Sequence, residues 1–124
     1  MKQVLLVAAG GAIGSVLRWA VSVWLARPGP AAFPWSTLAV NLLGSAAIGF
    51  VLALATERAG FPASLRLFVA TGVLGGFTTF SAFSWETLSL ARDGHALSAT
   101  AYVLASVLGG LAAAAGGSAI AAKF

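Results

Sequence analysis

The sequence predicts an all-α integral membrane protein, and its composition, its hydropathy and the length of its apolar runs support the prediction. Of the 124 residues, 60% are hydrophobic and 8% are charged, whereas a soluble domain carries about 25% charged residues. The mean hydropathy of the chain is +0.97. Each apolar run reaches the length of about 20 helical residues that crosses a hydrocarbon core. The chain has too few polar side chains to cover itself in water, so we expect a lipid bilayer around it.

The apolar runs divide the chain into four transmembrane helices of a single domain, residues 1–124. The runs cover about residues 4–26, 35–56, 65–90 and 96–122. Proline and glycine gather in the short connections "RPGPAAFP", "ERAGFP" and "RDGH". Connections this short predict that neighbouring helices run antiparallel. The first run is too long for the apolar part of a signal peptide, and Arg18 interrupts it before any clear cleavage site.

Residue usage excludes several functions. The chain has no cysteine and one histidine, His95, so it holds no disulfide, no thiolate metal site and no histidine cluster. The net charge is +4, but the basic residues are scattered singly rather than gathered into a patch that would bind nucleic acid. The spans hold no serine–histidine set and no paired carboxylates. We therefore expect neither an enzyme nor a nucleic-acid-binding protein.

The flanking charges leave two topologies open. One side of the membrane carries Lys2, Arg58, Arg66 and Lys123, and the other carries Arg27 and Arg92. Arg18 lies inside the first span but nearer the second side. Orientation follows the bias of Lys and Arg between short flanking segments, and this bias is small. One interpretation is a fixed orientation with the first side in the cytoplasm. The other is insertion in both orientations, with the chain pairing antiparallel with itself.

Every span carries small residues four positions apart, which predicts close helix packing. The pairs are Gly10 with Gly14, Gly11 with Ser15, Ser45 with Gly49, Gly72 with Gly76, and Ser106 with Gly110. Lipid supplies no hydrophobic drive for helix association, and such faces let helix backbones approach instead. Because each span has one, we expect an assembly larger than one chain.

Three polar side chains inside the spans are candidate functional residues. Arg18 lies about 21 Å along the first helix at 1.5 Å per residue, where a charge is costly unless it is paired or reaches the surface. Glu86 on the third span reaches a similar depth. An ion pair between Arg18 and Glu86 and a basic vestibule that attracts anions are both open, and they are compatible. Asn41 on the second span either joins helices or offers an amide N–H to an anion.

The stretch "TGVLGGFTTFSAF", residues 71–83, predicts a break in the third helix. Each glycine costs about 1 kcal/mol relative to alanine inside a helix. Irregular backbone at membrane depth persists only where protein buries it or where it lines a wet cavity. Broken helices near the midplane expose carbonyls to cations in many transport proteins. Residues 75–79 lie about halfway along their span, so we expect a conduction protein with a central ion site.

Three motifs of the chain resemble the signatures of the small bacterial fluoride channels, the Fluc or CrcB family. The motifs are "GGAIGSVLRW", "STLAVNLLGS" and "GGFTTFSAF", each in the expected span, and the likeness covers the whole chain. The sequence departs from the usual pattern at Trp19, Ser36 and Ala46, and Gly110 stands where some relatives have a hydroxyl. The resemblance implies a dual-topology antiparallel homodimer in the inner (plasma) membrane. Its two antiparallel pores would let fluoride leave the cytoplasm passively.

The resemblance also implies roles for individual residues. The fluoride pore would be lined by Phe80, Phe83, Asn41, Tyr102, Ser106 and Thr79. Arg18 would lie in the vestibule, and the backbone carbonyls of Gly75 and Thr78 from both subunits would bind a structural Na⁺. An aromatic ring has a negative face and a positive edge, so the phenylalanines would meet the anion edge-on.

Two other functions fit parts of the sequence. A small four-helix, dual-topology multidrug exporter has the same size, but such proton-coupled exporters use a carboxylate in the first helix. The first span here has none, and its one charge is Arg18. A membrane scaffold would explain the glycines but leaves "GGFTTF" and Asn41 without a role. The sequence therefore predicts a fluoride channel, with the multidrug exporter as the alternative.

Overall fold

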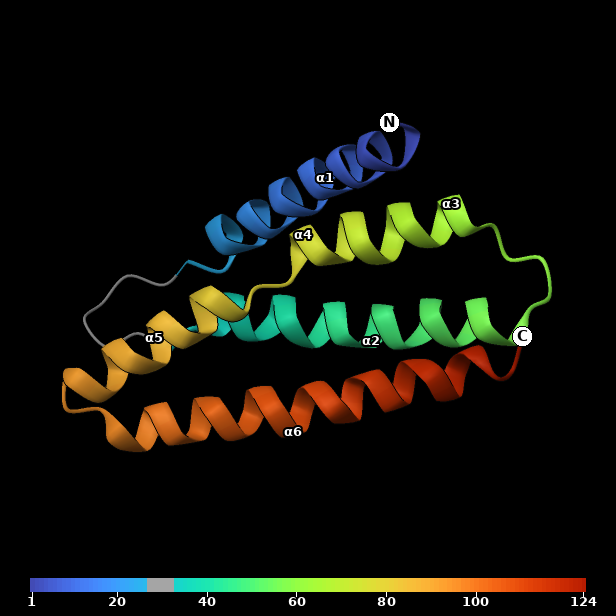
Figure 1. Cartoon of the computed structure of the whole chain (residues 1–124). Coiled ribbons are helices and arrows are strands. Elements are labelled where there is room, and N and C mark those ends of the chain that lie inside the picture. The colour runs from blue at the N-terminus through green and yellow to red at the C-terminus, as the bar shows by residue number, and fades with distance from the viewer. Residues whose placement is uncertain (27–32) are drawn as a thin grey trace.

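The structure is a computed structural model that describes residues 1–26 and 33–124. Four helical segments are long and apolar enough to cross a membrane, and they lie alongside one another in an elongated bundle (Figure 1). The four predicted spans are confirmed, with ends that differ by only a few residues. Most of the predicted first connection, Arg27 included, lies outside the described residues.

Three of the four segments are continuous helices, and the third is divided. The continuous ones are α1 (Lys2–Trp24), α2 (Trp35–Glu57) and α6 (Ala96–Ala121). The divided segment consists of α3 (Ala63–Arg66), the π-helix η1 (Leu67–Leu74), α4 (Gly75–Phe77) and α5 (Phe80–Arg92). The sequence does not predict η1, whose wider turns close i→i+5 hydrogen bonds.

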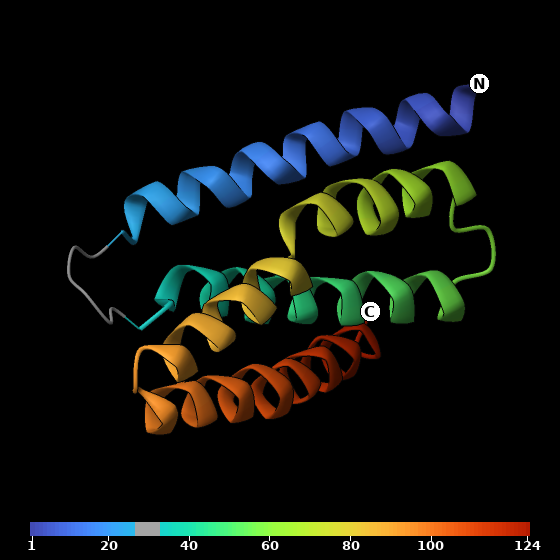
Figure 2. The same ribbon diagram turned by 60° about the vertical axis from the view of Figure 1, so that its left-hand side comes forward.

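The third segment breaks at Thr78 and Thr79. Both residues are extended, with φ −79° and ψ 156° at Thr78 and φ −150° and ψ 116° at Thr79. The Ala82 N–H donates to Thr79 Oγ1 at 3.2 Å, so the threonine hydroxyl caps α5 in the way of an N-cap residue. The break that the sequence predicts within residues 75–79 is confirmed, and Figure 2 shows the chain crossing from α4 to α5 there.

Glycines allow two close helix pairings. α1 packs on η1 and α4, and α2 packs along α6 (Figures 1 and 2). A Cβ added to Gly10 would lie 2.9 Å from the Cα of Gly72, and one added to Gly117 would meet the backbone carbonyl of Ala46. No side chain fits at such distances, so the predicted packing through small residues is confirmed for both pairings.

The turn after α5 depends on Gly94. Its φ of 83° is a left-handed conformation that glycine adopts without a Cβ clash. The His95 N–H donates to the Leu90 carbonyl at 2.8 Å, and the Gly94 N–H donates to the Ala91 carbonyl at 3.3 Å. These are the two bonds of a Schellman motif, and they return the chain so that α6 packs against α5.

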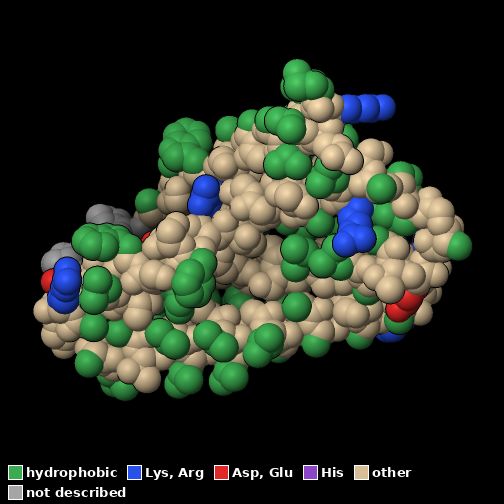
Figure 3. All heavy atoms as spheres, viewed as in Figure 1, with side chains coloured by type: hydrophobic (Ala, Val, Ile, Leu, Met, Phe, Trp, Pro, Cys, Tyr) green, Lys and Arg blue, Asp and Glu red, His purple; other side chains and the backbone are tan. Residues whose placement is uncertain are grey.

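Apolar side chains are spread over the outside of the molecule, and charged ones are few and separated (Figure 3). Few apolar side chains are buried, and four of them form one packed cluster: Leu38, Leu90, Ala99 and Tyr102. A helix that is apolar all round is typical of a membrane span. The chain is therefore a multi-pass membrane protein whose outer side chains face lipid or another protein.

Candidate functional site

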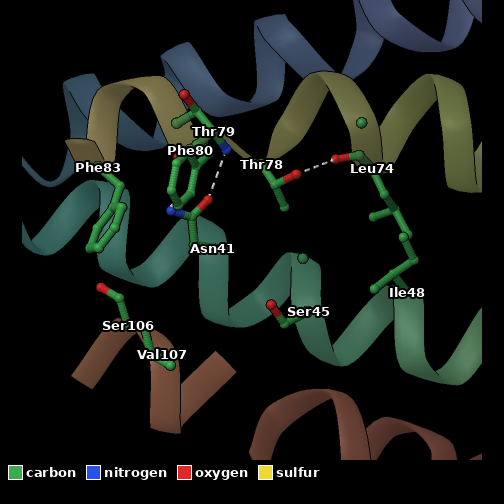
Figure 4. A pocket seen from close by; sticks show the side chains of 12 residues that line it. Asn41, Ser45, Ile48, Leu74, Thr78, Thr79, Phe80, Phe83, Ser106 and Val107 are labelled. Atoms are coloured by element: carbon green, nitrogen blue, oxygen red, sulfur yellow. Dashed lines mark hydrogen bonds between the residues drawn. The ribbon is translucent and has the colours of Figure 1, made fainter. Parts of the chain in front are cut away.

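A cavity of about 310 Å³ lies beside the break in the third segment. Figure 4 shows it enclosed by α2, the two halves of the broken segment and α6. Its lining residues are Asn41, Gly44, Ser45, Ile48, Leu74, Gly75, Thr78, Thr79, Phe80, Phe83, Ser106 and Val107. The polar groups at its wall are one side-chain amide, several hydroxyls and backbone N–H and C=O groups. None of the described residues that line the cavity is charged.

The side chain of Asn41 holds the break in place. Its Nδ2 donates to the Thr79 carbonyl at 3.0 Å, and the Thr79 N–H donates to its Oδ1 at 2.8 Å (Figure 4). Only an amide offers a donor and an acceptor in this arrangement; an ionised carboxylate accepts only. The amide has a second N–H, which makes no hydrogen bond within the described part of the chain. Asn41 therefore joins two helices and still has a donor to spare.

The break releases backbone carbonyls, among them those of Gly75 and Thr78. In a continuous helix the Gly75 carbonyl would accept from the Thr79 N–H, four residues on, but that N–H donates to Asn41. The Thr78 carbonyl would likewise accept from the Ala82 N–H, which donates to Thr79 Oγ1. Gly75 is exposed at mid-span. Free carbonyl oxygens of this kind are what a partly dehydrated cation binds in transport proteins.

Phe80 and Phe83 lie on the first turn of α5 and line the cavity. Their ring centroids are 5.5 Å apart and the rings are tilted by 45°. Phe83 is half-buried and packs on Tyr102 at 5.2 Å, whereas Phe80 is 78% exposed in the single chain. The ring of Phe80 is therefore accessible to a ligand in the cavity.

The hydroxyl of Ser106 is a buried donor without a partner. It is the one buried side-chain polar atom in the described residues that makes no hydrogen bond, and the residue lines the cavity from α6. Leaving such a group unpaired costs about 1–3 kcal/mol. The Ser106 hydroxyl can therefore donate a hydrogen bond to an acceptor in the cavity, such as an anion or a water molecule.

Tyr102 lies in the core and not at the cavity wall. It is fully buried, and its hydroxyl donates to Glu86 Oε2 at 2.7 Å. Thr37 Oγ1 donates to Glu86 Oε1 at 2.8 Å. Sequence reasoning missed Thr37, although its place one turn before Asn41 puts the two on the same face of α2.

The ion pair between Arg18 and Glu86, one of the two interpretations of these charges, is not formed. Within residues 1–26 and 33–124, the side-chain hydrogen bonds of Glu86 do not include one from Arg18. Both oxygens of Glu86 instead accept from the hydroxyls of Thr37 and Tyr102. Hydroxyls are the nearer donors because α2 and α6 flank Glu86, and Arg18 stays half-exposed on α1.

The cavity brings together most of the residues predicted for ion binding. Those at its wall are Asn41, Thr79, Phe80, Phe83, Ser106, Gly75 and Thr78. Arg18 and Tyr102 are not among its lining residues. Ser45 lines it too, although the sequence predicted only a packing role for it. Its spacing of four from Asn41 is the signal that could have placed both on one face.

A bundle of four spans with a broken helix, and at the break an uncharged, mostly apolar cavity with a few polar groups, is the architecture of a membrane transport protein. The family model described as "CrcB-like protein, Camphor Resistance (CrcB)" matches residues 5–118. The chain belongs to this family.

Similar proteins in three bacteria carry the name "Fluoride-specific ion channel FluC". The one from Rhizobium meliloti (strain 1021) is 52% identical over 108 residues, which are 86% of each chain. The one from Roseiflexus sp. (strain RS-1) is 49% identical over 104 residues, 84% of each chain. The one from Anaeromyxobacter dehalogenans (strain 2CP-1 / ATCC BAA-258) is 46% identical over 114 residues, 92% of this chain and 90% of the relative. The family resemblance seen in the motifs is confirmed, and with it the prediction that the chain is not an enzyme.

Proposed function

We propose that this chain is a fluoride-selective channel through which fluoride leaves the cytoplasm passively across the inner (plasma) membrane. The relatives named as fluoride channels support this function. The observation that carries it is the cavity itself, which hydrogen-bond donors and two phenylalanine rings line and where no described lining residue is charged. Without a fixed positive charge, an anion is not held too tightly to leave.

Fluoride in this site exchanges part of its hydration for protein donors. The second N–H of Asn41 and the unpaired hydroxyl of Ser106 supply hydrogen bonds, and Phe80 and Phe83 supply positive ring edges. The N-terminus of α5 adds a partial positive charge from its unpaired N–H groups. Thr79 positions that N-terminus through its capping hydroxyl.

Two predicted residues take part from outside the cavity. Arg18 is half-exposed on α1, and we assign it to a vestibule where its charge attracts anions before they enter the uncharged cavity. Tyr102 continues the polar path on α6 one turn before Ser106, and its hydroxyl bond to Glu86 fixes its orientation. Neither residue would hold fluoride alone.

The working form is an antiparallel homodimer of dual topology, with two pores. Phe80 is 78% exposed and Gly75 is exposed near mid-span, so the functional region of one chain has an open side that a second chain would cover. The near-balance of flanking Lys and Arg agrees with insertion in both orientations. In such a dimer each pore would combine donors and ring edges from both subunits.

A structural Na⁺ fits the carbonyls of Gly75 and Thr78. No group of three or more His, Cys, Asp or Glu that could hold a metal occurs in the described residues, so backbone oxygens would be the ligands. Two chains related by a two-fold axis would supply four oxygens, from both copies of Gly75 and Thr78. When bound, the ion would supply a positive charge at the dimer centre that joins the subunits.

Fluoride efflux from liposomes that contain the purified protein tests the proposal. We expect rapid efflux, read with a fluoride electrode, and chloride efflux at the level of protein-free liposomes. No fluoride flux, or equal flux of both halides, would defeat the channel. A multidrug exporter would instead need a carboxylate at its binding site, and none lines the described cavity.

A further inference from the structure

Ser45 presents a hydroxyl to the cavity at the middle of the membrane. It lies on α2 four residues after Asn41, hence on the same helix face, and its side chain stands at the wall opposite the break (Figure 4). Ser45 and Ser106 are each ten residues from the start of their helices, which is about 15 Å along each helix at 1.5 Å per residue. However, Gly110 rather than Ser106 lies against Ser45, so the Ser106 hydroxyl is about one turn, roughly 6 Å, nearer the start of the two helices than that of Ser45.

The hydroxyl of Ser45 is able to donate a hydrogen bond to a ligand in the cavity. Serine and threonine in helices often donate to the carbonyl of the preceding turn, as Thr78 does to Leu74 at 2.9 Å and Thr87 to Phe83 at 2.7 Å. Ser45 makes no such bond within the described residues. Both this hydroxyl and that of Ser106 are thus without protein partners beside one cavity.

Gly110 leaves room for the Ser45 hydroxyl. It lies on α6 one turn after Ser106, and a Cβ added to it would have a single neighbour within 4 Å, Ser45 Oγ at 3.6 Å. The Ser45 hydroxyl therefore stands next to the point from which a side chain of residue 110 would project. At this turn α6 has a glycine, Gly110, in place of a polar side chain, and Ser45 on α2 supplies the hydroxyl instead.

We propose that Ser45 positions fluoride, and that Ser106 and Ser45 are successive donors, about one helical turn apart along the cavity, for the partly dehydrated anion. The inference rests on the proposed channel function and extends it by one residue. Donors matter most at this depth, because an anion far from water has no other way to recover lost hydration. If Ser45 served helix packing alone, its Cβ would suffice and its hydroxyl would be dispensable.

Moving the hydroxyl from α2 to α6 tests the proposal. We expect Ser45→Ala to lower fluoride flux in liposomes at least about tenfold, the effect of losing one hydrogen bond to a charged group. The double variant Ser45→Ala/Gly110→Ser returns a hydroxyl to the same place and should restore much of the flux. The matched control Ser45→Ala/Gly110→Ala returns carbon only and should not restore it. Ser118→Ala, an exposed position elsewhere on α6, should conduct as the unaltered chain does.

Two outcomes would overturn the inference. Flux of Ser45→Ala equal to that of the unaltered chain would show that the hydroxyl is not used. Equal rescue by Gly110→Ala and Gly110→Ser would show that Ser45 acts through packing. If the alanine variant fails to assemble, Ser45→Cys keeps the size but has only a weak S–H donor, and unaltered flux in that variant would also contradict the proposal. The unaltered chain tells the two hypotheses apart. If it conducts no fluoride, the channel function itself fails. If both it and Ser45→Ala conduct normally, the channel function stands and only the role of Ser45 is refuted.

Discussion

At the scale of single residues, the amide of Asn41 has two tasks. It closes a pair of hydrogen bonds with the backbone of Thr79, at 3.0 and 2.8 Å, and it keeps one N–H for the cavity. The first task fixes the conformation of the break and so releases the carbonyls of Gly75 and Thr78. The second supplies a donor to an anion. One side chain thus couples the geometry of the backbone to the proposed chemistry of the pore.

Asn41→Asp should impair both tasks. The carboxylate still accepts from the Thr79 N–H, but it repels the Thr79 carbonyl and any anion in the cavity. We expect fluoride flux to fall about 100-fold, which corresponds to about 3 kcal/mol of barrier. Liposome flux and the size-exclusion profile measure the two effects. Flux at the level of the unaltered chain would place the pore away from Asn41.

Phe80 and Phe83 should differ in how they respond to substitution. Phe80→Ile removes an exposed ring, so we expect about a tenfold loss of flux with an unchanged thermal midpoint in detergent. Phe83→Ile also removes the contact with Tyr102 at 5.2 Å and should lower both flux and the midpoint. Equal loss of thermal stability in both variants would show that Phe80 has a packing role.

At the scale of elements, the bundle depends on backbone approach at glycine. Gly116 and Gly117 are neighbours on α6, yet a Cβ on Gly116 would meet nothing within 4 Å, while one on Gly117 would meet the Ala46 carbonyl of α2. Neighbouring residues of a helix point about 100° apart. Gly117 therefore faces α2, and Gly116 points away from it. Adjacent glycines therefore have different structural roles.

Alanine at these two positions should give opposite results. Gly117→Ala forces α2 and α6 apart and should cost about 1–3 kcal/mol or more. Gly116→Ala adds helix propensity without a clash in the single chain and should gain up to about 1 kcal/mol. Unfolding in detergent with increasing denaturant measures both changes. A similar loss in the two variants would mean that a surface at Gly116 is also covered, as in a tight assembly.

Much of this architecture follows from the sequence, because membrane helices obey length and hydropathy. The spans and the break near Gly75 were predictable from patterns along the chain, and most of the cavity wall was predicted from the resemblance of three motifs to a known family. The π-helix η1 was not, since the wider turns arise where its backbone meets that of α1 at Gly10 and Gly72. The partners of Glu86 were not predictable either, because Thr37 and Tyr102 reach it from two other helices.

At the scale of the whole molecule, one chain leaves its functional region open. The core is limited to a few residues, while Phe80 and Gly75 are exposed near mid-span. Lipid does not hydrogen-bond to carbonyl oxygens, so such groups need a partner from protein or from a wet cavity. A second, inverted copy would cover these carbonyls and complete the pores.

Dual topology predicts that each end of a span lies on both sides of the membrane, and cysteine labelling can test this. The chain has no cysteine, so single cysteines at Ser64 and at Asp93 report on opposite ends of the third segment, where both residues are exposed. If the chain inserts both ways, a membrane-impermeant maleimide applied outside intact cells should label about half of each variant. The charge bias across the membrane is small, and Lys and Arg flanking the spans set orientation. Labelling of one variant only, with the other protected until the cells are opened, would establish a fixed orientation. Antiparallel pairing would then be impossible, and the carbonyls of Gly75 and Thr78 would need a partner other than an inverted copy of this chain.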